Sequence, residues 1–116
     1  MKKHLVLLLA LAATLLMTNC TKDRYYVRYE ATATSTYHSG KMTLNVNTDT
    51  GMQTYTTSSK LYSETFGPVS KGFEASINAS TNYGAYLNTS IYVSKGEDPF
   101  VLKASGGPTA EYVIDF

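Results

Sequence analysis

The chain has 116 residues, with ten Lys or Arg and nine Asp or Glu, and a formal charge of +1 at pH 7. If residues 1–19 are a signal, Lys2 and Lys3 leave with them, and the remaining 97 residues carry eight basic and nine acidic side chains. This length excludes a multidomain enzyme, and this charge excludes a basic nucleic-acid binder. Ten Tyr, together with many Thr and Ser, favour strands over a helical bundle.

Residues 1–19 have the pattern of an export signal. Lys2 and Lys3 form a short basic start, and Leu5 to Met17 follows as the apolar run LVLLLALAATLLM. A run of about thirteen residues is shorter than the roughly 20 needed to span a bilayer, and it is typical of a signal-peptide core. We therefore predict a signal peptide over residues 1–19.

The apolar run ends at Met17-Thr18-Asn19-Cys20, which resembles a bacterial lipobox, although Asn19 stands where Gly, Ala or Ser is usual. Lys22-Asp23 resembles the surface-export signals of Bacteroidetes-type lipoproteins. We predict that Cys20 is lipidated, with palmitate-type acyl chains, and that residues 20–24 tether a domain to the outer membrane of a bacterial cell envelope, on its periplasmic side or at the cell surface. The alternative is an ordinary secretory signal that leaves a free thiol, an oxidation liability that lipidation would remove.

From residue 25 onward, apolar side chains recur with period 2, which is the pattern of half-buried strands. These alternating runs begin at Tyr25, Met42, Phe73, Leu87, Phe100 and Tyr112. Asp49-Thr50-Gly51 predicts a hairpin into a further strand over Met52 to Ser58, because Gly51 can take the positive φ of a tight turn. Gly67-Pro68 punctuates the middle of the chain as a turn signal.

Seven to eight short strands with turns every few residues predict an all-β fold. We expect a single antiparallel, immunoglobulin-like β-sandwich over residues 25–116, with inward faces of Val, Leu, Ile, Phe, Tyr and Ala. Periodicity alone leaves a small barrel open as the competing architecture.

The order of these features resembles the mycobacterial membrane protein small family, the MmpS-type transport accessory proteins. Val27 to Ala33 stands where that family has its Val-x-Tyr-Glu-Val-x-Gly opening, and Met42 to Gly51 matches its strand and Gly turn. Phe66-Gly67-Pro68, Ile91-Tyr92-Val93 and Ala104 to Gly107 follow in the family's order. The chain lacks the family's Cys pair and its Pro-Trp, and has a lipobox in place of a membrane helix. The resemblance implies a sandwich fold and assistance to an envelope exporter.

Catalytic side chains are scarce, and we predict no enzyme activity, cofactor or metal. His38 is the only histidine beyond the signal, and it lies in an expected turn beside Ser39 and Gly40. No thiol remains for a nucleophile once Cys20 is lipidated, and the carboxylates are scattered. Glu97-Asp98, in another turn, offers at most a share in a weak calcium site.

Tyrosine is the residue type most open to a binding role. Tyr83 and Tyr86 bracket a Gly-containing turn and Tyr92 follows on a strand, so we take these three as candidate binding residues. The alternative is that Tyr simply suits a half-buried strand surface. We therefore predict a lipid-anchored accessory or interaction module for an envelope protein partner such as a transport system. A small lipoprotein that binds glycans or other ligands through exposed Tyr is the second hypothesis.

Overall fold

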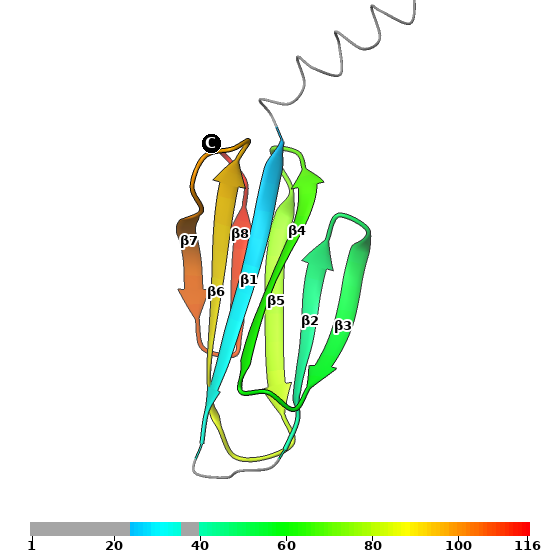
Figure 1. Cartoon of the computed structure of the whole chain (residues 1–116), viewed down its shortest axis with the longest axis vertical. Coiled ribbons are helices and arrows are strands. Elements are labelled where there is room, and N and C mark those ends of the chain that lie inside the picture. The colour runs from blue at the N-terminus through cyan, green and yellow to red at the C-terminus, as the bar shows by residue number, and fades with distance from the viewer. Residues whose placement is uncertain (1–23, 36–39) are drawn as a thin grey trace, which may run out of the picture.

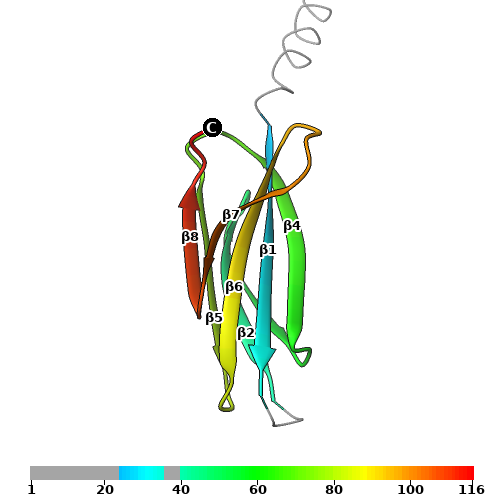
Figure 2. The same ribbon diagram turned by 90° about the vertical axis from the view of Figure 1, so that its left-hand side faces the viewer.

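The computed structural model describes residues 24–35 and 40–116, and these residues form eight strands and no helix. The strands are β1 (Tyr25–Thr34), β2 (Met42–Thr48), β3 (Gly51–Thr57), β4 (Leu61–Val69), β5 (Glu74–Thr81), β6 (Tyr86–Lys95), β7 (Val101–Gly106) and β8 (Thr109–Val113). They form two antiparallel sheets, ordered β4-β1-β6-β7 and β3-β2-β5-β8, which Figures 1 and 2 show as two layers. Two separate sheets confirm the predicted sandwich and exclude the small barrel.

The core lies between the sheets and follows the predicted alternation. Every second residue of β1 is buried, from Tyr25 to Ala33, and β2 buries Met42, Leu44 and Val46 in the same way. β5 and β6 supply the facing residues Ala75, Ile77, Ala79, Ile91 and Val93. Because a strand turns successive side chains to opposite faces, this pattern fixes which residues remain on the two outer faces.

Strand β4 was not predicted, because Gly67-Pro68 indicates a turn in the sequence. In the structure this pair lies inside β4, which pairs only with β1 and forms an edge of its sheet. Gly67 and Pro68 lie where the β1–β4 register shifts between Tyr25 and Val27, and neither has a partner in the ladder. Proline has no N–H to donate, so it is tolerated at such an irregularity of an edge strand. The turn signal was therefore wrong at this point.

A bulge in β7 corrects the prediction that Phe100, Leu102 and Ala104 all face inward. Ala104 lies opposite buried Ile91, but the next residue of β6, Tyr92, lies opposite Leu102, so Lys103 is the extra residue. An extra residue moves the side chains beyond it to the other face. Phe100 and Leu102 therefore lie on the outer face of the sheet, beside Tyr92.

The described chain begins and ends at the same pole of the sandwich (Figure 1). Gly96 N donates to Arg24 O over 2.7 Å, and the Tyr25 hydroxyl bonds to Phe116 O. At the opposite pole Ser35 Oγ donates to Gly84 O over 2.7 Å. A membrane anchor upstream of Arg24 would therefore lie at the first pole, which we call the N-terminal pole, and the second pole, called the far pole, would lie away from it.

Candidate interaction surfaces

The candidate residues do not form one cluster. Tyr83 and Tyr86 lie at the far pole, whereas Tyr92 lies six residues further along β6, on the outer face of its sheet. Six residues of strand span about 20 Å, so Tyr86 and Tyr92 cannot contact the same small ligand. Cys20 and His38 fall outside the described residues.

Tyr83 has a packing role. A Cβ built at Gly40 would lie 2.1 Å from Tyr83 Cδ1, so the ring lies directly on the glycine backbone. Gly40 also has a φ of 145°, a conformation that side-chain-bearing residues rarely adopt. Contact with the backbone occupies one face of the Tyr83 ring, which leaves less of it for a ligand.

Tyr86 is the most exposed large hydrophobic side chain in the described part of the protein, at 83%. It borders a surface hollow of about 500 Å³, which is also lined by Thr34, Ser35, Gly84 and Ala85. An exposed ring beside a concave surface can stack on a flat apolar face of a ligand. Of the three candidate tyrosines, Tyr86 is the one whose surroundings suit binding.

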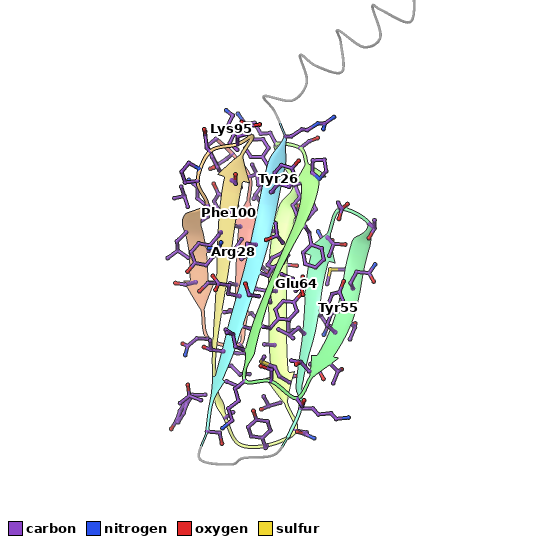
Figure 3. The ribbon with its side chains drawn as sticks, in the orientation of Figure 1. Tyr26, Arg28, Tyr55, Glu64, Lys95 and Phe100 are labelled. Atoms are coloured by element: carbon purple, nitrogen blue, oxygen red, sulfur yellow. The ribbon has the colours of Figure 1, made fainter. Side chains whose placement is uncertain are left out.

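Tyr92 has an aromatic and cationic neighbourhood that the sequence did not predict. The Arg28 guanidinium carbon lies 4.5 Å from the centre of the Tyr92 ring and 4.8 Å from that of Phe100. Arg28 Nε also lies 3.5 Å from a carboxylate oxygen of Glu30, without forming a hydrogen bond. Figure 3 shows Arg28 and Phe100 on this face. The cation holds Tyr92 in a cluster on the sheet surface.

A groove of about 510 Å³ marks the outer face of the other sheet, near the N-terminal pole. Its lining residues are Asn47, Met52, Glu74, Ala75, Ser76, Glu111, Tyr112 and Val113. The β2–β5 ladder ends at the pair Val46 and Ile77, so Asn47 and Ser76, which would pair next, do not. The groove therefore lies where the two strands part.

The Tyr29 hydroxyl bridges this gap from the core side. It donates to Asn47 O over 2.6 Å and accepts from Ser76 N over 3.1 Å, so a residue of β1 ties together two strands of the opposite sheet. Burial raises the pKa of Tyr29 to about 12, although the Ser76 N–H partly opposes this. The neutral hydroxyl is thus the form that the fold uses.

Aromatic rings close the side of the sandwich between β3 and β4. Tyr55 of β3 lies 6.0 Å from Tyr62 and 6.2 Å from Phe66, measured between ring centres. The Tyr62 side chain is buried, and its hydroxyl has no hydrogen-bond partner. Burial, and then the nearby Glu64 carboxylate, raises the pKa of Tyr62 well above its ordinary value. These contacts hold the edge strand β3 against the body of the domain.

Exposed apolar side chains gather on the edges of the sheets. Of the seven large ones in the described residues, six belong to edge strands. They are Met52 and Tyr55 of β3, Leu61 of β4, Val101 and Leu102 of β7, and Val113 of β8. Apolar residues beside unpaired backbone groups are suited to contacts with another polypeptide.

Across residues 24–35 and 40–116, no three His, Cys, Asp or Glu side chains gather closely enough to hold a metal ion, and Glu97 and Asp98 are both exposed. No helix in these ranges has the length and apolar character needed to cross a membrane. No protein-family model, curated protein or solved structure matches the chain.

Proposed function

We propose that the protein is a non-enzymatic envelope lipoprotein, anchored through Cys20, whose β-sandwich is an accessory or interaction module for an envelope protein partner. Arg24 lies four positions after Cys20 in the sequence. A chain of that length spans at most about 14 Å, so the N-terminal pole would lie close to the bilayer. The resemblance to transport accessory proteins makes a membrane transport system the partner we propose.

The position of the exposed apolar side chains is the observation that carries this proposal. Six of the seven lie on edge strands, along the sides of the domain, and a domain anchored at one pole would present those sides to neighbours in the membrane. Anchoring raises the local concentration of such neighbours, so that even modest contact areas suffice for association.

We expect a Cys20→Ala variant of the full chain to move from the membrane fraction to the soluble fraction and to lose acyl labelling. Two acyl chains anchor a protein stably, because each buried CH₂ contributes about 0.8 kcal/mol, and the substitution removes the sulfur that would carry them. Fractionation and labelling with a palmitate analogue measure both effects. Affinity purification of the unmutated chain from its own envelope should recover a membrane protein that Cys20→Ala does not.

Two results would contradict this proposal. A Cys20→Ala chain that still fractionates with membranes would exclude the lipid anchor. Failure to recover any envelope protein with the unmutated chain, under conditions that preserve membrane complexes, would exclude the interaction module.

The far pole favours a second candidate function, the capture of a glycan or another small ligand. Tyr86 is 83% exposed beside its hollow and faces away from the proposed anchor. Stacking of a sugar ring on Tyr needs an accessible aromatic face. Neither Tyr83, which packs on Gly40, nor Tyr92, which packs on Arg28, supplies one as freely.

If this second function holds, the full chain should bind members of a glycan array and unfold at a higher temperature in their presence. Tyr86→Ala should abolish both effects without lowering the melting temperature of the free protein, because the side chain buries little surface. Tyr92→Phe, which keeps the ring under Arg28, is the matched control and should retain binding. An array without hits, or binding that survives Tyr86→Ala, would exclude this function for the far pole.

A further inference from the structure

Strand β3 differs from the other three edge strands. Its seven residues, GMQTYTT, contain no charge and no proline, and it pairs with β2 along its whole length without a bulge. Each of the other edges has a feature that discourages pairing with another chain. β4 contains Glu64 and Pro68, β7 contains Lys103 and its bulge, and β8 is short and contains Glu111. An edge without such a feature is a template for another strand.

The ladder determines which backbone groups of β3 are free. Ala79 N donates to Pro108 O, on the β8 side of β5, so Asn78 and Ser80 point their backbone groups at β2. The backbone N–H and C=O groups of successive residues point to opposite sides of a strand, and the two residues of a hydrogen-bonded pair point toward each other. The β2–β5 and β2–β3 registers therefore determine which residues of β3 point toward β2. The backbone groups that point toward β2 are those of Gln53, Tyr55 and Thr57. Met52, Thr54 and Thr56 therefore direct their N–H and C=O groups away from the sheet.

This free edge is complementary to itself. When two copies of β3 lie antiparallel about a two-fold axis at Thr54, each Thr54 faces the other, and Met52 faces Thr56 of the other copy. These are the three residues whose backbone groups are free, so every outward N–H meets an outward C=O. On the inner side Gln53 faces Tyr55 of the other copy. No like charges meet, and Thr–Thr and aromatic cross-strand pairs are favourable.

We propose that β3 is the site at which two copies of this protein associate, by antiparallel pairing centred on Thr54, so that two four-stranded sheets become one continuous sheet. The contacts of Tyr55 with Tyr62 and Phe66 hold the strand in place before pairing, which limits the entropy lost on association. One pair of seven-residue strands buries less than the roughly 1,200–2,000 Å² of a stable interface, so the dimer is weak and depends on concentration.

The proposed dimer does not depend on the lipid anchor, and its two-fold axis has a consequence for anchored copies. The axis turns the N-terminal poles in opposite directions, since β3 runs along the long axis of the domain (Figure 1). Two copies anchored by short tethers in one bilayer cannot pair in this way. Pairing then joins copies in different bilayers, or copies released into detergent.

Introduced cysteines test the register in the full chain, purified in detergent and mildly oxidised. The Cα atoms of a hydrogen-bonded antiparallel pair lie about 5.5 Å apart, within disulfide range, so Thr54→Cys should form a crosslinked dimer. Thr56→Cys is the matched control on the same face of the same strand. In the proposed dimer, the two substituted positions would lie four residues apart along the paired strands, about 13 Å, and should not crosslink. The unmutated chain controls for Cys20.

Thr54→Pro provides a second measurement. The backbone N–H that this substitution removes points away from β2, so the fold should be retained. Sedimentation should show that the concentration-dependent dimer is lost. Equal crosslinking of Thr54→Cys and Thr56→Cys, or crosslinking of neither, would overturn the proposal. So would a dimer in detergent that survives Thr54→Pro.

Discussion

Replacing Tyr29 by Phe is expected to lower the free energy of unfolding by about 1–3 kcal/mol, a substantial part of the stability of a small domain. The substitution keeps the ring and its packing on Phe66, at 6.0 Å between centres, and removes only the hydroxyl. Asn47 O and Ser76 N then lose their shared partner at the point where the β2–β5 ladder has already ended. Both groups are only partly buried and belong to residues that line the groove, so each lost hydrogen bond costs about 0.5–1.5 kcal/mol. Chemical denaturation monitored by circular dichroism measures the loss.

Tyr62→Phe is the matched control because it makes the same chemical change at another buried ring. The Tyr62 hydroxyl has no hydrogen-bond partner, so its removal leaves no other group unsatisfied. We expect this variant to be unchanged or more stable by up to about 1 kcal/mol. If the two variants lost equal stability, the bridging of β2 and β5 by the Tyr29 hydroxyl would not be the cause.

These two tyrosines differ in a property that the sequence does not predict, namely whether the buried hydroxyl has hydrogen-bond partners. Tyr29 belongs to the predicted alternation of the first strand, whereas Tyr62 belongs to β4, which was not predicted, and both rings are buried. A buried tyrosine hydroxyl has hydrogen-bond partners only where backbone groups of the opposite sheet are left unpaired. The local sequence does not indicate that the β2–β5 ladder ends at such a point. The strands themselves were predictable where both neighbours are present, because β1, β2, β5 and β6 bury every second residue.

The edge strands were harder to predict, since a strand with one neighbour does not have to follow the interior pattern. β3 was predicted from its turn and its β-favouring residues, although almost all of it is exposed. β4 was missed because Pro68 indicates a turn in the sequence, and the bulge at Lys103 reversed the predicted faces of Phe100 and Leu102. The proline inside β4 and the bulge in β7 depart from the regular strand pattern, and they depend on pairing with strands that are distant in sequence.

The candidate tyrosines illustrate the same limit for function. Tyr83 and Tyr86 bracket one turn and have similar sequence neighbourhoods. Tyr83 packs on Gly40, which is 43 residues earlier in the chain, whereas Tyr86 remains exposed. Arg28 reaches Tyr92 because β1 and β6 are neighbours with those two residues in register. The contacts that cover the rings of Tyr83 and Tyr92, but leave the Tyr86 ring accessible, come from residues distant in sequence.

Alkaline pH should destabilise the domain through the same buried hydroxyls. The pKa of Tyr29 is about 12 in the folded protein, against 10.0 in the unfolded chain, so folding favours its neutral form. Its contribution is therefore complete below pH 10 and is lost as the pH rises toward 12. Two pKa units correspond to about 3 kcal/mol. The raised pKa of Tyr62 acts in the same direction and extends the loss to higher pH.

Denaturant unfolding at several pH values between 8 and 12, with tyrosinate absorbance followed in parallel, measures this loss. The slope of unfolding free energy against pH should fall by up to about 1.4 kcal/mol per pH unit for each tyrosine that ionises only on unfolding. Tyr29→Phe should remove one such contribution and flatten the curve between pH 10 and 12, even though it lowers stability at pH 8. Identical slopes for the variant and the unmutated protein would show that Tyr29 ionises as readily in the fold as in the unfolded chain. That outcome would also contradict its role as a neutral bridge between β2 and β5, because a tyrosinate cannot donate to Asn47 O.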